Sequence, residues 1–196
     1  GTAVHYVCDE DSEWYPDIDD MRSKITDKTK AIVIINPNNP TGALYPKEVL
    51  QQIVDLAREH QLMIFSDEIY DRLVMDGLEH ISIASLAPDL FCVTFSGLSK
   101  SHMIAGWRVG WMVAPLEVAK AAAKLQGHMT SNVANISQRA ALAAVAGPLD
   151  EVHEMRKAFD ARRRAIVTAL NDIEGVNCPT PTGAFYAFAD ITALLG

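Results

Sequence analysis

The segment Ser96–Trp111 reads SGLSKSHMIAGWRVGW; one apolar run, residues 91–95, precedes it, and a second, residues 109–114, begins within its last three residues. The length of these runs and their β-branched and aromatic content predict two buried strands. Lys100 therefore stands in a turn of small residues between core strands. Such a lysine either reaches solvent, as most lysines do, or is shielded and reactive. A shielded lysine can form an imine with an aldehyde cofactor, and the guanidinium of Arg108 can bind the phosphate of that cofactor.

Two further apolar runs end in polar side chains. Residues 31–35 are followed by NPNNPTG at residues 36–42, and residues 62–65 are followed by SDEIY at residues 66–70. Continuous apolar runs of this length are typical of buried parallel strands. In open α/β sheets, ligands bind beyond the carboxyl ends of the strands. The pattern therefore predicts that three side chains meet at one edge of one sheet: Asn39, Asp67 and Lys100.

These motifs resemble those of the class I aminotransferases, which are fold-type I pyridoxal-phosphate enzymes. The motifs that carry the resemblance occur in the family's order: NPNNPTG at residues 36–42, Asp67 followed by Tyr70, SGLSK at residues 96–100, and then Arg108. The resemblance extends over nearly the whole chain. Up to about Trp111 the chain is most similar to bacterial alanine aminotransferases, and from Thr130 onward it is more similar to the bacterial aspartate and aromatic branch.

The resemblance implies an α/β fold, with a three-layer αβα large domain around a mostly parallel sheet and the beginning of a small α+β domain. We expect residues 1–147 to form part of the cofactor-binding large domain, residues 148–175 to form an interdomain helix, and residues 176–196 to begin the small domain. Relatives are much longer, so we expect this chain to be a fragment that is inactive in isolation. The phosphate-binding turn, the ring-stacking aromatic residue and the arginine for the substrate carboxylate are expected outside it.

Periodicity and turn residues place the other elements. They predict a strand over residues 3–8, helices over residues 17–25, 46–60, 117–126 and 136–145, a long helix from residue 152 to residue 175, and strands over residues 176–178 and 184–189. The helix over residues 46–60 would connect two parallel strands through a right-handed crossover.

The resemblance also implies roles for the polar residues at the sheet edge. A carboxylate at the end of a core strand is costly unless it is paired, and a protonated pyridine nitrogen is a suitable partner for Asp67. Lys100 would hold the cofactor and move the proton, while Tyr70 and Asn39 would bind ring oxygen O3′. Locally, Asn39 also fits a plain Asn-Pro turn. The implied catalytic residues are Lys100, Asp67 and Tyr70, and the implied cofactor-binding residues are Asn39, Asp67, Tyr70, Ser96, Ser99, Lys100 and Arg108.

One position departs from the common pattern. Many relatives carry a hydroxyl three residues before the lysine, and here Gly97 occupies that position. Ser96 and Ser99 are the remaining hydroxyls that could bind phosphate. Arg108 is better suited to bind the phosphate than a lysine would be, because its planar fork can donate to two phosphate oxygens.

Composition narrows the class of protein. The chain has 25 acidic and 17 basic residues, which argues against a nucleic-acid-binding surface. We expect the one basic run, residues 162–164, to be a solvated helix face, and Glu68 to be a helix-start or surface acid. Three widely spaced cysteines, an odd number, favour a reduced cytoplasmic setting over a disulfide framework or a metal site. No apolar run reaches membrane-spanning length, and we do not expect the start of the sequence, residues 1–3, to be a signal peptide.

The implied activity is transfer of an amino group between an L-amino acid of the alanine or aspartate type and a 2-oxo acid such as 2-oxoglutarate. The implied cofactor is pyridoxal 5′-phosphate, the expected partners are these small molecules, and the full-length enzyme is expected to be a cytoplasmic homodimer without nucleic-acid or membrane partners. Two alternatives stay open. One is a carbon-sulfur β-lyase or another fold-type I enzyme, because Lys100, Asp67 and Arg108 would look alike in all of them. The other is an inactive, truncated cofactor-binding module.

Overall fold

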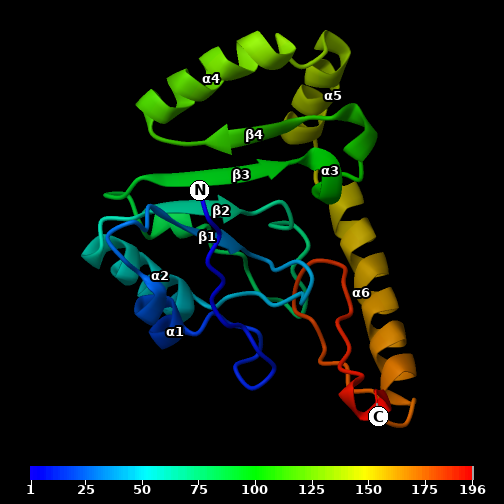
Figure 1. Cartoon of the computed structure of the whole chain (residues 1–196). Helices are drawn as coiled ribbons and strands as arrows, with labels where there is room; N and C mark the ends of the chain where they lie inside the picture. Colours follow the sequence, from blue (N-terminus) through cyan, green and yellow to red (C-terminus); the bar gives the residue numbers. More distant parts are fainter. Residues whose placement is uncertain (196) are drawn as a thin grey trace.

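Four strands form a sheet in the order β1-β2-β3-β4 in the computed structural model, which describes residues 1–195 (Figure 1). The strands are β1 (Ala31–Ile35), β2 (Met63–Asp67), β3 (Cys92–Gly97) and β4 (Gly110–Val113). The first three strands are parallel, and β4 is antiparallel to β3. The prediction of a mostly parallel sheet is therefore confirmed. Residue 196, the last of the predicted small-domain segment, lies outside the described residues.

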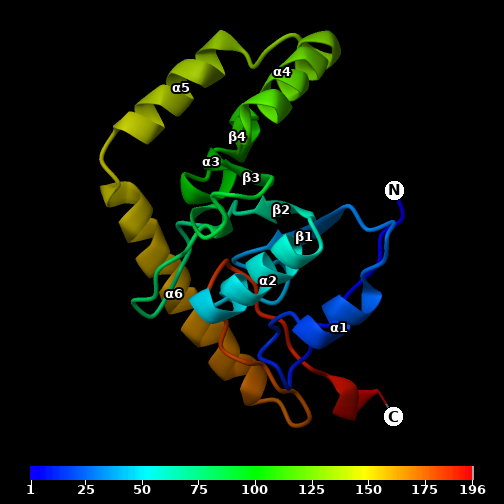
Figure 2. The same cartoon turned by 90° about the vertical axis from the view of Figure 1, so that its left-hand side faces the viewer.

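Helices surround this sheet. They are α1 (Ile18–Lys24), α2 (Lys47–Glu59), α3 (Leu98–Ser101), α4 (Leu116–Thr130), α5 (Asn135–Ala146) and α6 (Asp150–Asn171). Short 3₁₀ turns occupy Ile83–Ser85, Ala105–Trp107 and Thr192–Leu194. Figures 1 and 2 show α1 and α2 together beside β1 and β2, α4 and α5 beyond β4, and α6 on the side to which the arrowheads of β2 and β3 point. No helix within residues 1–195 is long and apolar enough to cross a membrane.

Local signals account for the two helices that cover β1 and β2. The Asp17 carboxylate accepts a hydrogen bond from the Asp20 N–H at 2.9 Å and so caps the start of α1. Pro46 immediately precedes α2, where its missing N–H costs nothing. The apolar stripe of α2 is fully buried against the sheet: Leu50, Ile53, Val54, Leu56 and Ala57. These helices agree with the predicted ones.

The predicted strand over residues 3–8 is wrong. This segment joins no strand among the described residues. The carbonyl of Val7 accepts from the Asp17 N–H at 3.0 Å, and the Val7 N–H donates to the Asp20 carboxylate at 2.8 Å. The backbone of Val7 is therefore bonded to the start of α1 rather than to a strand, and the segment reaches β1 through the Tyr6 hydroxyl, which donates to the Val33 carbonyl at 2.9 Å.

The two predicted small-domain strands are also absent from the described residues. Residues 176–178 and 184–189 do not pair with each other, and the one isolated bridge of the first segment joins Asn177 to Asp190, just beyond the second. Other backbone groups of these segments bond elsewhere: the Cys178 N–H donates to the Asn171 side chain at 2.7 Å, and the Ala184 N–H donates to the Leu73 carbonyl at 2.9 Å. Competing partners therefore replace the ladder that a strand needs.

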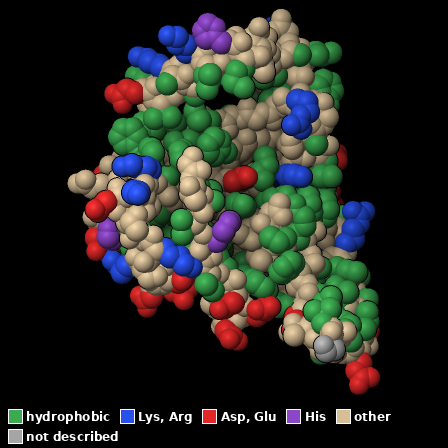
Figure 3. Space-filling view, viewed as in Figure 1, with side chains coloured by type: hydrophobic (Ala, Val, Ile, Leu, Met, Phe, Trp, Pro, Cys, Tyr) green, Lys and Arg blue, Asp and Glu red, His purple; other side chains and the backbone are tan. Residues whose placement is uncertain are grey.

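The run over residues 109–114 forms a strand, β4, but the prediction that this strand is buried is wrong. Trp111 is 41% exposed and Val113 is 61% exposed. Within the described residues, β4 pairs with β3 alone and stands at the edge of the sheet. Hydrophobic side chains consequently reach the surface below α4, as Figure 3 shows.

Candidate active site

The carboxyl ends of the three parallel strands lie side by side. In the register of the sheet, Ile35 pairs with Asp67, and Asp67 pairs with Phe95. The loops that follow β1, β2 and β3 therefore start side by side at the carboxyl end of the sheet. Asp67 is at the centre of that end, and its carboxylate accepts a hydrogen bond from the Ile69 N–H at 3.1 Å.

Lys100 lies in the short helix α3, directly after β3, and is half-buried. Its Nζ is 5.7 Å from the centre of the Tyr70 ring and 5.2 Å from the centre of the Phe185 ring. None of the ion pairs among residues 1–195 includes Lys100. Its amine is thus placed against two aromatic faces, which attract a cation without neutralising it, and stays available for bonding to a ligand.

Tyr70 connects this amine to the C-terminal part of the chain. Its side chain is 2% exposed, and its hydroxyl shares a hydrogen bond with the Tyr186 hydroxyl. The Phe185 ring meets the Tyr70 ring edge to face at 5.3 Å. Burial, together with the hydrogen bond to Tyr186, raises the pKa of Tyr70. Tyr70 therefore keeps its proton and can act as a neutral hydrogen-bond donor.

Phe185 and Tyr186 are site residues that the sequence analysis missed. Their signal is the run GAFY at residues 183–186, which lies beyond the predicted site motifs and carries no charged or metal-binding group. Two N–H groups, those of Thr182 and Gly183, donate to the Gly42 carbonyl at 3.1 and 2.8 Å. The C-terminal segment is thus bonded to the NPNNPTG loop, and this contact brings the two aromatic rings to Lys100.

The glycine at position 183 makes that contact possible. A Cβ at Gly183 would lie 2.6 Å from the Cβ of Pro37, so the two segments could not approach as they do with a larger residue. Gly42 faces the same segment at a backbone φ of 74°, in the left-handed region. Both glycines are therefore required by geometry at this junction.

A cavity of about 190 Å³ lies where the end of β3 meets the start of β4. Its lining includes Ser99, Arg108 and the backbone at Gly97. A guanidinium and a hydroxyl at one cavity form a donor set that suits a phosphate. The predicted phosphate ligand Ser96 is placed differently, because its hydroxyl donates to the Glu68 carbonyl at 3.5 Å.

The departure at Gly97 has a steric reason. A Cβ at this position would lie 2.9 Å from the Val109 carbonyl oxygen and 3.0 Å from the Gly110 Cα. The end of β3 is thus in close contact with the start of β4. A residue with a hydroxyl side chain would separate the two strands.

The NPNNPTG loop presents Asn39 at the surface. Two other amides stabilise the loop: the Asn36 Oδ1 accepts from the Tyr45 N–H at 2.8 Å, and the Asn38 Oδ1 accepts from the Thr41 hydroxyl at 2.8 Å. Asn39 is exposed, and residues 1–195 give its side chain no hydrogen bond. Its amide is therefore open to a ligand, although no observed contact links it to Lys100.

The expectation that Glu68 is a helix-start or surface acid is wrong. Glu68 is 4% exposed, and its Oε1 accepts from the Ser66 hydroxyl at 2.9 Å, the Ser82 hydroxyl at 3.1 Å and the Ile83 N–H at 3.3 Å. His80 Nε2 lies 3.8 Å from Oε2. Several donors thus compensate its burial, and two of the contributing residues are distant in sequence.

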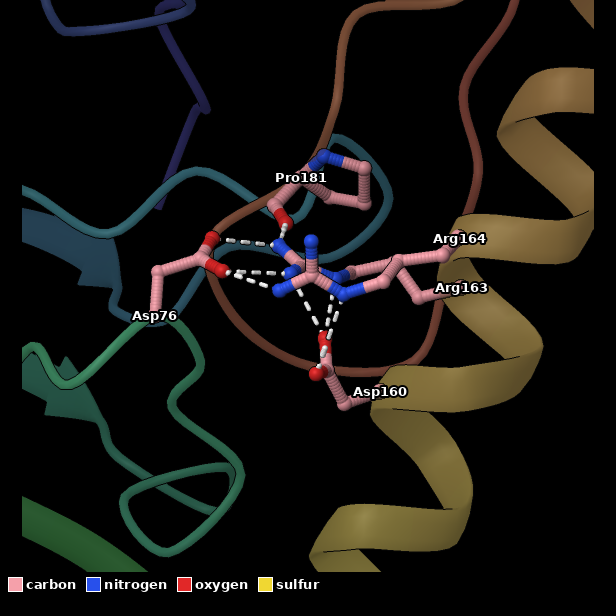
Figure 4. Close-up of polar contacts among 5 residues, drawn as sticks. All are labelled: Asp76, Asp160, Arg163, Arg164 and Pro181. Atoms are coloured by element: carbon pink, nitrogen blue, oxygen red, sulfur yellow. Dashed lines mark hydrogen bonds and ion pairs between the residues drawn. The ribbon is translucent and has the colours of Figure 1, made fainter.

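The basic run at residues 162–164 is only partly a solvated face. Arg162 and Arg164 are exposed, but Arg163 is 7% exposed. Figure 4 shows the Arg163 guanidinium directed at Asp76 and at the Pro181 carbonyl. Its NH1 and NH2 donate to the two Asp76 carboxylate oxygens, each at 2.7 Å. Burial of the middle arginine is compensated by a carboxylate far away in sequence, which the local pattern does not reveal.

Comparison with known proteins identifies relatives over the whole described chain. The family model "Aminotransferase class I and II" matches residues 1–195. Glutamate-pyruvate aminotransferase AlaA of Escherichia coli K12 is 48% identical over 98% of this chain and 49% of its own length. An aspartate aminotransferase of Streptomyces avermitilis is 45% identical over 100% of this chain and 48% of its own length.

The solved structures agree. The crystal structure of an aminotransferase from Escherichia coli superposes with a TM-score of 0.92 at 47% identity, and the match covers 99% of this chain and 50% of that one. The chain therefore spans about half the length of the relatives it matches.

Proposed function

The chain belongs to the class I and II aminotransferases, and from this premise we propose that the protein containing it transfers an amino group between an L-amino acid and a 2-oxo acid. The proposed donors are of the alanine or aspartate type, and the proposed acceptor is 2-oxoglutarate or a similar acid. The names of the relatives, glutamate-pyruvate and aspartate aminotransferase, support this choice and do not favour a β-lyase or an inactive module. The observation that carries the proposal is the half-buried Lys100 amine, held against aromatic faces at the sheet edge.

The proposed cofactor is pyridoxal 5′-phosphate, and the residues present fit it. When bound, this group supplies an aldehyde that bonds to an amine and a ring that accepts electrons. Lys100 supplies an amine with no carboxylate partner among the described residues. Arg108 and Ser99 line one cavity and would hold the phosphate, with Ser96 as a further proposed ligand.

The remaining residues would orient the cofactor and hold or move protons at its ring and at the substrate. The Asp67 carboxylate would hold a proton at the pyridine nitrogen, and the neutral hydroxyl of Tyr70 and the amide of Asn39 would donate to O3′. The amine of Lys100 would take a proton from the substrate Cα and pass it to C4′ of the cofactor. The rings of Phe185 and Tyr70 would exclude water from this amine, which strengthens the electrostatic contacts around it.

The proposal extends to domain organisation and assembly. We assign residues 1–147 to the large domain, residues 148–175 to the interdomain helix and residues 176–196 to the start of the small domain. A cytoplasmic homodimer is proposed for the complete enzyme. Large exposed apolar side chains on α4 and α5 support burial against further protein, since Met129 is 72% exposed and Ile136 is 70% exposed. The free thiols of all three cysteines are compatible with a reducing compartment.

The test uses the full-length protein. Its visible absorption spectrum with pyridoxal phosphate is recorded before and after borohydride, and the modified peptide is mapped. A reducible band trapped on Lys100 is the expected result, and a label on another residue would overturn the assignment. Amino-group transfer that requires a 2-oxo acid acceptor is expected with alanine or aspartate. Release of ammonia and pyruvate from a cysteine-type donor without an acceptor would instead establish the β-lyase reaction.

A further inference from the structure

Arg163 uses its whole guanidinium in contacts with its own helix and with two other segments. From α6 its NH1 and NH2 reach the Asp76 carboxylate at 2.7 Å, its Nε donates to Asp160 at 2.9 Å, and its NH1 also donates to the Pro181 carbonyl at 2.6 Å (Figure 4). A planar, five-donor group can satisfy such an arrangement, whereas a single ammonium cannot. Arg163 therefore links α6, the loop after β2 and the C-terminal segment.

The contact with Pro181 lies at one end of a run of backbone pairing. The Met75 N–H donates to the Thr182 carbonyl at 3.0 Å, and the Ala184 N–H donates to the Leu73 carbonyl at 2.9 Å. An isolated bridge pairs Val74 with Gly183. The pair of Arg163 and Asp76 thus lies at one end of these paired backbone segments, and Ala184 lies at the other end.

Phe185 and Tyr186 follow directly after Ala184. Phe185 stacks on Phe159 of α6, with ring centres 5.4 Å apart. Phe159 and Arg163 are four residues apart on this helix, so they share one face. One face of α6 therefore contacts the C-terminal segment twice, once at a carbonyl and once at the ring that lies 5.2 Å from the Lys100 amine.

We infer that Arg163 is a positioning residue: by clamping Pro181 to Asp76 it holds Phe185 and Tyr186 over Lys100 and Tyr70. The inference rests on the proposed function and deepens it, because it names the interaction that orients the aromatic cover of the reactive amine. Arg163 makes its contact with the C-terminal segment at the Pro181 carbonyl and not at the Phe185 or Tyr186 ring. It therefore acts through the backbone of residues 181–186.

Arg164 provides a matched control. It donates to the same Asp76 carboxylate at 2.8 Å and to Asp160 at 3.2 Å. Its side chain is 61% exposed, against 6% for Arg163, and its hydrogen bonds among the described residues do not include Pro181. Substituting Arg164 removes one positive charge from the cluster while leaving the contact to the C-terminal segment in place.

The first measurement is amide hydrogen exchange of the full-length protein without cofactor. Arg163→Gln is expected to speed exchange at Thr182, Gly183 and Ala184 by about tenfold or more, since a charge-assisted hydrogen bond to the segment is lost. Arg164→Gln is expected to leave these amides unchanged, and Arg163→Lys to lie between the two. Equal exchange in the two glutamine variants would overturn the inference. If Arg163→Gln does not fold, Arg163→Lys against Arg164→Gln makes the same comparison.

The second measurement is the visible circular dichroism of the cofactor-loaded protein, normalised to the amount of cofactor that borohydride traps on Lys100. This signal reports the asymmetric surroundings of the bound group, so we expect it to fall in Arg163→Gln and Arg163→Lys and to remain in Arg164→Gln. Faster amide exchange with an unchanged circular dichroism signal would show that Arg163 has a purely structural role and would contradict the positioning role. Absence of trapped cofactor in the unmodified protein would instead remove the proposed function, while the exchange rates would still decide whether Arg163 holds the segment.

Discussion

The amine of Lys100 lies 5.2 Å from the centre of the Phe185 ring. One residue comes from the turn after β3 and the other from the C-terminal segment, so the candidate site is built from distant parts of the chain. The Tyr70 ring, 5.7 Å from the same amine, completes the contact. A lysine that is held by aromatic faces is shielded from water on those sides but keeps its amine free to react.

Removing the Lys100 amine should abolish cofactor trapping. In the full-length protein, Lys100→Ala is expected to show no borohydride-trapped cofactor and a loss of transfer activity of about 10²-fold or more, because the proton-transfer group is gone. Peptide mapping and a coupled assay measure both effects. Lys28→Ala, at an exposed position before β1, is the control and should match the unmodified protein. Trapped cofactor in a folded Lys100→Ala protein would contradict the assignment.

Gly97→Ala should separate β3 from β4. The added methyl would lie 2.9 Å from the Val109 carbonyl oxygen, and relief of such overpacking typically costs about 1–3 kcal/mol of the free energy of unfolding. Urea denaturation measures this loss. Gly106→Ala is the matched control, because nothing lies within 4 Å of a Cβ there. Equal stability of the two variants would show that the strand contact is looser than described.

The hydroxyls of Tyr70 and Tyr186 should be energetically coupled. A double-mutant cycle of Tyr70→Phe and Tyr186→Phe is expected to give a coupling of about 1 kcal/mol in the free energy of unfolding, since each single change leaves the other hydroxyl without its partner. Denaturant titrations of the four proteins measure it. Strictly additive effects would mean that the two hydroxyls do not share this hydrogen bond.

Asp76 should make the protein sensitive to acid. Hydrogen bonds from Arg163 hold the pKa of the Asp76 carboxyl below its ordinary value of 3.8. A lowered folded-state pKa contributes stability that is present above 3.8 and is lost as the pH falls through the folded-state pKa. The urea midpoint should therefore fall less steeply with acid in Asp76→Asn, although that variant starts from a lower stability.

The exposed residue Asp27 supplies the control for this titration. Asp27→Asn should retain the acid dependence of the unmodified protein. An unchanged acid dependence in Asp76→Asn would exclude the Arg163 pair as its source.

Glu68 should matter for stability through its oxygen atoms. Glu68→Ala leaves the Ser66 hydroxyl, the Ser82 hydroxyl and the Ile83 N–H without their acceptor, and each unsatisfied buried donor costs about 1–3 kcal/mol. Glu68→Gln retains an acceptor and should lose less. Thermal and urea unfolding rank the two variants. A glutamine variant as unstable as the alanine variant would indicate that the charge of Glu68, rather than its hydrogen bonding, is required.

Much of the architecture could be predicted from local signals. Residues 31–35 and 62–65 are continuous apolar runs next to turn residues, and the stripe of α2 repeats at helical spacing, so element type follows from short windows of sequence. Burial along β1 is less complete than the run predicts, because Val33 is 57% exposed. The prediction failed for residues 3–8, where the pattern suits a strand but the backbone of Val7 bonds to the residues that begin α1. Local pattern cannot choose between two such partners.

The sequence by itself determined which segments form the parallel strands, the order of the motifs, and the placement of Asp67 at the end of β2 and of Lys100 just after β3. These features depend on neighbouring residues in the chain. Only the tertiary structure decided that Arg163 is buried and that Phe185 covers the Lys100 amine. A buried charge or an aromatic contact depends on the group that compensates it or packs against it. For Arg163 that group is Asp76, on a loop that only folding brings to α6.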